Sequence, residues 1–361
     1  MPFWQIWVSN SLMAARLQTF YDAAKPLLIA ATMTTSRHFL NASLLSAVAL
    51  AAPYAQAQAQ TPSYPSKPIR IVVPFGPGGA TDVVARTVAD KLSARLGQPM
   101  IVDNKPGAST MIGADAVAKA APDGYTLLVS GSSTYSVAPA LKERMPYDHQ
   151  KDLALIALLV KAPLVLVSGP SAPVKSLAEL IALAKSKPGD LGYATFGTGS
   201  APHLLGEMFA HEAGIKVLGV PYKGSAPASM ALLGGEIHYA FDTITSAGAN
   251  IKAGKLRPLA VSSVQRITAL PDVPTLGELK LGKASFDAFY GLAAPAGTPV
   301  AIQQLLGREV AAIMALPDVK EKMLAAGLEP GFLDAPAFNA KVVDEIATFK
   351  AAGKRANITM E

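Results

Sequence analysis

Short apolar runs alternate with amphipathic stretches along the chain after Ser66. Helices are expected between the runs, and one begins at Ser176, where Glu179 three residues later completes a capping box. This alternation is typical of βα units, so it predicts an α/β fold in which helices flank mainly parallel sheets. The expected strands are 69–74, 100–103, 126–130, 164–168, 192–195, 217–221, 239–242, 256–262 and 290–294.

Two proline-containing breaks interrupt this pattern, at 161–172 and at 289–299. At each break an apolar strand runs into prolines, as expected where the chain passes from one folded lobe to another. Two passages predict a discontinuous first lobe, 64–165 plus 290–361, and a second lobe, 166–289. Small ligands commonly bind in a cleft between two such lobes, where helix N-termini face it.

The segment 68–82, PIRIVVPFGPGGATD, takes a buried strand through a glycine-rich turn into a helix. The first backbone N–H groups of a helix lack internal partners and carry partial positive charge, so such a junction can bind an anion. Gly76, Gly78 and Gly79 remove the side chains that would block the approach. The alternative is a tight strand-to-helix turn without a ligand, and this segment alone does not decide between them.

The front of the chain has the order of a secretory signal peptide. Within 34–59, a positively charged start precedes an apolar stretch and a series of small residues. We expect cleavage near Ala57 or Ala59 and export to the periplasm, with Met33 as an alternative start. Residues 1–60 therefore lie outside the predicted fold. The alternative, a retained membrane anchor, is disfavoured because the apolar stretch is short for a bilayer.

The 361-residue chain contains no cysteine, which excludes disulfides, thiol chemistry, cysteine metal ligands and the lipid-anchored cysteine of a lipoprotein. Its net charge is +6, and removal of residues 1–60 takes away three basic residues and one acidic residue, leaving +4. The absence of any run of like charge argues against nucleic-acid binding and permits a preference for small anions. The remaining chain, about 300 residues, is long enough for two cores.

Enzyme motifs are missing from the sequence. A hydrolase would use Ser200 as nucleophile and His203 as base, but Ser200 does not sit in a Gly-x-Ser-x-Gly elbow and no third triad member is evident. The five histidines show no His-Glu-x-x-His spacing, and neither nucleotide-binding glycine motif occurs. We therefore expect no catalytic residue, no metal and no cofactor.

Several motifs in a fixed order relate the chain to a known family. They are YPSKPIRIVVPFGPGGATDVVAR (64–86), LGQPMIVDNKPGA (96–108), APDGYTLL (121–128), FGTGSAPHL (196–204), PYKGSAPASMALLGGEI (221–237) and LPDVPTLGE (270–278). Over 64–355 the chain resembles the Bug-type solute receptors of tripartite tricarboxylate transporters. The resemblance implies a periplasmic protein with a two-lobed type II binding-protein fold, which holds a ligand carboxylate between loops of the two lobes.

The resemblance places the first-lobe loop at 75–82 and the facing second-lobe loop at 197–203, where a second helix N-terminus follows a strand. The hydroxyls near the cleft have an alternative role in local turns, and Asp242 either reads a distal polar group or amine of the ligand or caps the next helix. The candidate ligand-binding residues are Phe75, Gly76, Gly78, Gly79, Thr81, Asp82, Ser132, Ser133, Thr134, Thr198, Gly199, Ser200, Ala201, His203, Gly224, Ser225, Asp242 and Thr243.

The chain departs from the usual family pattern at one place. A lysine stands in the stretch 104–107, and Ala108, Ser109 and Thr110 replace a more glycine-rich continuation. We expect neither change to touch the two anchor loops.

The function expected from these observations is that of a receptor and not an enzyme. It binds a dicarboxylate, tricarboxylate, amino acid or aromatic acid and passes it to the membrane subunits of a tripartite transporter, with a monomer as the default state. The alternative partner is a membrane signalling protein, which the sequence does not distinguish from a transporter.

Overall fold

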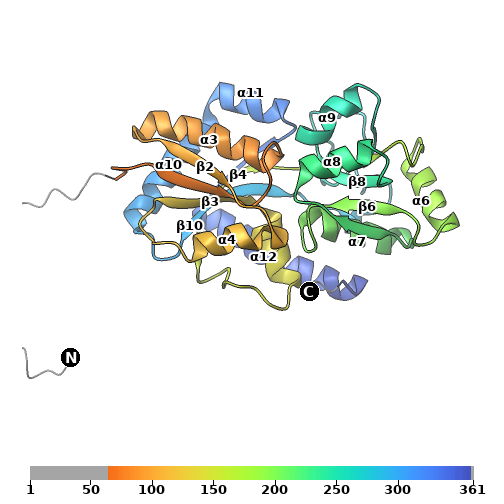
Figure 1. Ribbon diagram of the computed structural model, residues 1–361, viewed down its shortest axis with the longest axis horizontal. Helices are drawn as coiled ribbons and strands as arrows, with labels where there is room; N and C mark the ends of the chain where they lie inside the picture. Colours follow the sequence, from red (N-terminus) through yellow and green to blue (C-terminus); the bar gives the residue numbers. More distant parts are fainter. Residues whose placement is uncertain (1–63, 359–361) are drawn as a thin grey trace, which may run out of the picture. The chain divides into compact units, whose positions relative to one another are not determined.

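Two β-sheets organise residues 64–358, the part of the chain that the computed structural model describes (Figure 1). The predicted signal peptide, its cleavage sites and Met33 lie outside these residues. Within them, none of the helices combines the length and apolar character needed to span a bilayer.

The first lobe is built on a six-stranded sheet with the order β11-β4-β10-β3-β1-β2. Helices α3 and α10 cover one face of it, where their apolar side chains pack on Ile69, Ile71 and Val73, and α4 and α12 cover the other, where they pack on Val72. The strands are β1 (Ile69–Val73), β2 (Met100–Asn104), β3 (Thr126–Gly131), β4 (Leu153–Lys161), β10 (Phe289–Pro295) and β11 (Glu329–Asp334). The helices are α3 (Ala80–Leu96), α4 (Met111–Ala118), α5 (Ala138–Leu141), α10 (Val300–Ala315), α11 (Pro317–Ala325) and α12 (Ala335–Ala356), with short helical turns η2 (Ala108–Thr110) and η3 (Ser133–Val137).

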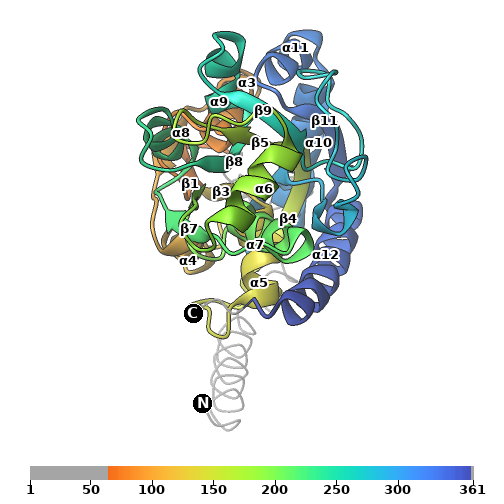
Figure 2. The same ribbon diagram turned by 90° about the vertical axis from the view of Figure 1, so that its right-hand side faces the viewer.

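The second lobe is built on a five-stranded sheet with the order β7-β6-β8-β5-β9. Alternate residues face opposite sides, so that Ala194 and Ala240 lie under α8 and α9 while Tyr193 and Tyr239 lie under α6 and α7 (Figure 2). The strands are β5 (Leu164–Ser168), β6 (Gly192–Thr195), β7 (Leu218–Pro221), β8 (Tyr239–Thr243) and β9 (Arg257–Val261). The helices are α6 (Leu177–Ser186), α7 (Ala201–Ala213), α8 (Ser225–Leu233) and α9 (Ile244–Lys252), with the short turn η4 (Gly282–Ala284).

The α/β class, the two lobes and every predicted strand are confirmed, and each strand ends within one residue of its prediction. The capping box of α6 forms in part, because the Ser176 hydroxyl accepts the N–H of Glu179 at 3.2 Å. The sequence reading missed β4 and β11. It was also wrong about mainly parallel sheets: β1 and β6 pair in parallel with their neighbours, but β10, β4 and β5 pair antiparallel with theirs. These antiparallel strands carry the chain between lobes, and so the sheets are mixed.

The two connections between the sheets lie side by side. The chain leaves the first sheet at Lys161 and enters the second at Leu164, and the N–H of Ala162 donates to the carbonyl of Ala288 on the returning segment at 2.6 Å. Since β4 belongs to the first sheet and β5 to the second, the chain first passes from one lobe to the other between Lys161 and Leu164. The exact limits of the lobes stay a prediction.

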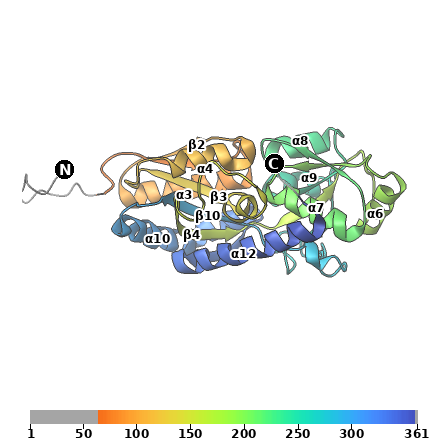
Figure 3. The same cartoon turned by 90° about the horizontal axis from the view of Figure 1, so that it is seen from below.

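Helix α12 belongs to both lobes. Its first half packs Phe338 and Val342 into the core beneath the first sheet, and its second half packs Phe349 and Ala352 into the core of the second lobe. The ring of Phe349 meets that of Phe286 edge to face, with centroids 4.9 Å apart. Figure 3 shows α12 running along the underside of the described fold beneath both sheets. The helix therefore joins the lobes independently of the two crossing segments.

Candidate ligand-binding site

Helices α3, α7 and α8 begin at the cleft between the two lobes. Their N-cap residues are Gly79, Ser200 and Gly224, and none of the three caps its helix through a side-chain hydrogen bond. Gly79 and Gly224 have no side chain to do so, and the Ser200 hydroxyl is buried without a hydrogen-bond partner in the described part of the chain. The first N–H groups of α3 and α8 therefore keep their partial positive charge toward the cleft, whereas the first N–H of α7, that of Ala201, donates to the Ser133 hydroxyl.

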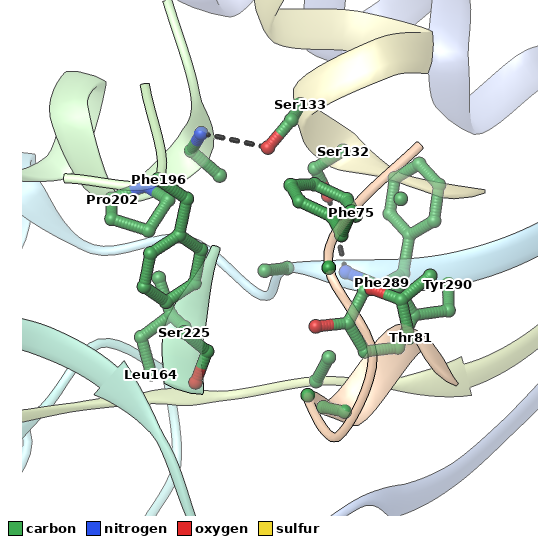
Figure 4. A pocket seen from close by; sticks show the side chains of 17 residues that line it. Phe75, Thr81, Ser132, Ser133, Leu164, Phe196, Pro202, Ser225, Phe289 and Tyr290 are labelled. Atoms are coloured by element: carbon green, nitrogen blue, oxygen red, sulfur yellow. Dashed lines mark hydrogen bonds between the residues drawn. The ribbon is translucent and has the colours of Figure 1, made fainter. Parts of the chain in front are cut away.

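A cavity with an empty volume of about 490 Å³, including its opening, lies between these helix ends (Figure 4). Both lobes and both crossing segments line it. Among the described residues, its wall contains no acidic, basic or histidine side chain. The polar side chains of the wall are Thr81, Ser132, Ser133, Ser225 and Tyr290, and the other lining residues are Phe75, Gly76, Gly79, Ala80, Gly131, Ala162, Leu164, Phe196, Ala201, Pro202, Ala288 and Phe289.

Ser132 and Ser133 are arranged as hydrogen-bond donors to this cavity. The Ser133 hydroxyl accepts the N–H of Ala201 at 2.9 Å, and the Ser132 hydroxyl accepts the N–H of Phe289 at 3.1 Å. Because each oxygen acts as acceptor in this contact, each hydroxyl retains its proton for another partner. Two O–H donors therefore line the same cavity as the N-termini of α3 and α8.

The Ser225 hydroxyl behaves differently, although its side chain also lines the cavity. Its oxygen lies 2.6 Å from Asp242 Oδ1, 2.9 Å from Thr243 Oγ1 and 2.5 Å from Ser246 Oγ. A hydroxyl donates once and accepts twice, so these three contacts use its full capacity. Ser225 thus has only its backbone N–H, at the start of α8, to offer an anion.

Hydrogen bonds also join the lobes across the cleft. The N–H of Gly76 donates to the carbonyl of Lys223 at 3.3 Å, and the Ser133 to Ala201 contact joins the start of η3 to the start of α7. A third bond runs from the Ser109 hydroxyl to the carbonyl of Thr198. The lobes are therefore in contact around the cavity.

The bond from Ser109 corrects the expectation that 108–110 would not touch the anchor loops. Ala108, Ser109 and Thr110 have φ values of 43°, 53° and 82°, so three residues in succession adopt a left-handed backbone. This turn carries the Ser109 side chain across to the second lobe, where it also packs against Gly197. The segment is part of the contact between lobes.

Eight of the candidate residues line the cavity, and the other ten surround it. The lining candidates are Phe75, Gly76, Gly79, Thr81, Ser132, Ser133, Ala201 and Ser225. The candidates outside the wall are Gly78, Asp82, Thr134, Thr198, Gly199, Ser200, His203, Gly224, Asp242 and Thr243.

Asp82 holds the first loop in shape. Burial raises the pKa of its carboxyl, but hydrogen bonds from Arg86 Nε at 2.9 Å, Gly78 N at 3.1 Å and Asn104 Nδ2 at 3.0 Å outweigh burial and lower it. The carboxylate thus fixes the glycine turn to α3 and β2. Gly78 has a φ of 84°, which suits glycine and closes that turn.

His203 has the same role in the second loop. Its Nδ1 accepts the N–H of Gly199 at 3.1 Å, and burial lowers its pKa, which keeps the ring neutral and able to accept. Ser200 Oγ is buried without a hydrogen-bond partner among the described residues, so it is not bonded to His203. The pair that a hydrolase would need is not formed.

The remaining candidates also make internal contacts. Thr134 is buried and joins the hydroxyls of Ser130 and Thr110 at 2.5 and 2.8 Å. Thr198 accepts the bond from Ser109 through its carbonyl, Gly224 supplies a turn with a φ of 129°, and Thr243 and Asp242 bond to Ser225.

Sequence reasoning missed the residues of the crossing segments. Ala162, Leu164, Ala288, Phe289 and Tyr290 contribute much of the apolar wall. The prolines predict both segments as crossings, and residues at a crossing between two lobes lie next to the cleft between them. That signal was sufficient to nominate them. The other missed lining residues are Ala80, Gly131, Phe196 and Pro202.

A model of the "Tripartite tricarboxylate transporter family receptor" matches residues 84–358. The chain belongs to this family. Protein BugT from Bordetella pertussis (strain Tohama I) is 39% identical over 285 residues, which cover 79% of this chain and 87% of BugT. Family members are solute-binding receptors and not enzymes, so this chain is a receptor and the hydrolase alternative falls.

Solved structures agree with the family assignment. The periplasmic binding protein BugD is 34% identical with a TM-score of 0.78, covering 82% of this chain and 99% of that one. The R. palustris protein Rpa4515 with adipate is 33% identical with a TM-score of 0.79, at the same coverage. MatC from Rhodopseudomonas palustris with bound malate is 31% identical with a TM-score of 0.76, covering 80% of this chain and 99% of that one. The receptor thus has the two-lobed fold of periplasmic binding proteins.

Proposed function

We propose that this receptor captures a small dicarboxylate between its lobes in the periplasm and delivers it to the membrane subunits of a tripartite transporter. The observation that carries the proposal is the uncharged cavity, around which helix N-termini and the Ser132 and Ser133 hydroxyls supply hydrogen-bond donors. Adipate and malate, the ligands of the two related structures, are both dicarboxylates.

Recognition of a carboxylate by neutral donors avoids a buried cation. A micromolar affinity corresponds to about −8 kcal/mol, and association opposes binding by at least ~4 kcal/mol. Hydrogen bonds to a charged group contribute roughly 1.5 to 3 kcal/mol each, so about four to eight are needed. The uncapped N–H groups of α3 and α8 and the two serine hydroxyls supply donors in that range. No desolvation of a lysine or arginine has to be offset.

The apolar part of the wall suits the carbon skeleton of such a ligand. Phe75, Phe196, Phe289 and Leu164 line the cavity beside the polar groups. Burial of apolar ligand surface against them adds affinity. The wall therefore favours an aliphatic acid over a strongly hydrated polyol or sugar.

Delivery follows from hinge motion of the two lobes. The lobes open and close about the paired crossing segments near 162 and 288, and the bonds across the cleft form on closure. A ligand that adds contacts to both lobes shifts the population toward the closed form, which the membrane subunits recognise. The signal-like residues 34–59 and the absence of cysteine support export to the periplasm without a lipid anchor, and a monomer is the default state for a receptor that closes by a hinge.

A thermal-shift screen of the purified protein tests the proposal. The panel contains aliphatic dicarboxylates including adipate and malate, tricarboxylates, amino acids and aromatic acids, each paired with its amide. A ligand at a thousand times its dissociation constant stabilises the folded state by about 4 kcal/mol, which raises the melting temperature by several degrees. We expect this rise with one or more dicarboxylates and not with the diamides.

The protein is first freed of co-purified ligand by partial unfolding, dialysis and refolding, and its fold is checked by circular dichroism. If the amides raised the melting temperature as much as the acids do, the proposal that the site recognises a carboxylate would be wrong. A rise with amino or aromatic acids alone would retain the receptor and replace its ligand class.

A further inference from the structure

Asp242 lies directly behind the cavity wall, at the carboxyl end of β8. It is fully buried, and its Oδ1 accepts the Ser225 hydroxyl at 2.6 Å and the N–H of Thr243 at 2.7 Å. Its Oδ2 is buried and has no hydrogen-bond partner among the described residues. Ser225, which donates to this carboxyl, also lines the ligand space.

The elements around Asp242 bring no positive charge to it. Helix α8 and the paired strands β5 and β6 contain no acidic or basic residue, and Lys252 stands at the opposite end of α9. Across the cavity, Asp82 of α3 is paired with Arg86. From β10, Tyr290 faces the carboxyl, and its pKa is raised to about 12, mainly by burial and in smaller part by Asp242.

This environment makes the charge of Asp242 sensitive to what enters the cavity. Burial raises the pKa of Asp242 to about 7, against the lowering effect of its hydrogen bonds. A ligand anion placed on the other side of Ser225 adds a second negative charge in a poorly solvated site, where two neighbouring anions do not both remain ionised. Either the ligand or Asp242 must then hold a proton.

We propose that Asp242 determines the charge that this site accepts: a dicarboxylate binds as its dianion only while Asp242 is protonated. The proposal rests on the proposed function and adds a specificity rule to it. When Asp242 is ionised at the moment of binding, it takes one proton from water. An ionised Asp242 conversely favours a ligand whose second polar group is neutral or an ammonium.

Isothermal titration of the purified protein with adipate and with malate tests this rule. At pH 8, in phosphate and in Tris, the difference in apparent enthalpy gives the protons taken up, and we expect about one per bound ligand. The affinity of the wild-type protein should fall by up to tenfold per pH unit above about 7. Asp242→Asn keeps an oxygen that can accept from Ser225 but cannot titrate, so we expect no proton uptake and an affinity that is flat with pH.

Glu345→Gln is the matched control, because within residues 64–358 Glu345 is the other buried carboxyl with a raised pKa, due mainly to burial. Glu345 differs from Asp242 in two respects. It has a cationic partner, since Lys341 Nζ lies 2.7 Å from its Oε1. Its hydroxyl partner, Ser136, does not line the cavity. This variant should take up the proton as the wild-type protein does. Binding of adipate or malate without proton uptake would overturn the rule while leaving the receptor function intact. If neither acid binds at any pH of the series, the proposed dicarboxylate function is rejected, and the rule with it.

A measurement without ligand tests the same premise if the variant binds poorly. A carboxyl whose folded-state pKa is raised stabilises the fold at low pH and loses this advantage as pH rises from its unfolded value through the folded one. As pH rises from about 4 to about 7, the free energy of unfolding of the wild-type protein, measured by urea denaturation, should fall relative to that of Asp242→Asn. Parallel stability profiles across that interval would contradict titration of Asp242 and overturn the proposal.

Discussion

Gly79 stands where the N-terminus of α3 meets the second lobe. Its φ of −84° is open to any residue, and a Cβ atom added there would lie 3.7 Å from the Cβ of Ser225. A larger side chain is therefore compatible with the backbone and extends into ligand space. We predict that Gly79→Val weakens carboxylate binding at least about tenfold, while the free energy of unfolding changes by no more than about 1 kcal/mol because only an N-cap glycine is lost. Titration calorimetry and urea denaturation measure the two quantities.

Gly78 offers the matched control, since it is adjacent in sequence but does not line the cavity. Its φ is 84°, and a Cβ there would meet nothing within 4 Å. Gly78→Ala should then lower stability by about 1 to 2 kcal/mol through the left-handed backbone and leave affinity nearly unchanged. The site would have to be placed elsewhere if Gly79→Val bound as tightly as the wild-type protein.

At the scale of single residues, the sequence predicted the loops of the site better than the direction of each side chain. Glycines and hydroxyls after buried strands nominated Gly76, Gly79, Ser132 and Ser133, which line the cavity, and their role in ligand binding stays a prediction. Asp82 could not be separated from them, because a carboxylate that holds a turn and one that faces a ligand have the same local sequence. The difference lies in distant partners such as Asn104, which no local pattern specifies.

At the scale of secondary structure, strands with turn residues at both ends were predictable and the crossing strand β4 was not. Its sequence, LALIALLVK, is a continuous apolar run, which suits a buried helix as well as a buried strand. Pairing with β10 and β11 decides the matter, and both lie more than a hundred residues further along the chain. The antiparallel direction of these strands escaped prediction for the same reason.

The left-handed segment 108–110 allows a test of the contact between lobes. Ser109 combines a φ of 53° with a hydrogen bond to the second lobe, and the two features can be separated by substitution. Ser109→Ala removes the hydroxyl and keeps the unfavourable backbone, whereas Ser109→Gly removes both. We predict that the two variants release ligand faster than the wild-type protein by similar factors. The glycine variant should be more stable than the alanine variant by about 1 to 2 kcal/mol.

Stopped-flow dissociation and urea denaturation of the two Ser109 variants provide these values. Ligand release at the wild-type rate from both would show that the Ser109 contact does not hold the closed form. Equal stabilities would show that the backbone at this position carries no strain.

At the scale of the whole fold, three connections guide the lobes: the two crossing segments and helix α12. The crossings are bonded to each other at Ala162 and Ala288, and α12 places Phe349 in the second core. The proposed hinge motion at the crossings would preserve both sheets, because the hydrogen bonds that it would break are those across the cleft. The prolines in the sequence were enough to predict the two crossings. That α12 packs into both lobes could not be predicted, because it depends on contacts between residues far apart in the chain.

Because the chain has no cysteine, an engineered pair can report the approach of the lobes without competition from native thiols. Cβ atoms at positions 79 and 225 would lie 3.7 Å apart, within the range that a disulfide requires. We predict that the double variant Gly79→Cys with Ser225→Cys forms this bridge under mild oxidation. The bridged protein should melt at a higher temperature and bind no ligand, since the bridge occupies the cavity, and a reductant should reverse both effects. Each single variant serves as control. Accessible thiols that fail to pair would mean that the lobes of the unliganded protein do not approach as they do here.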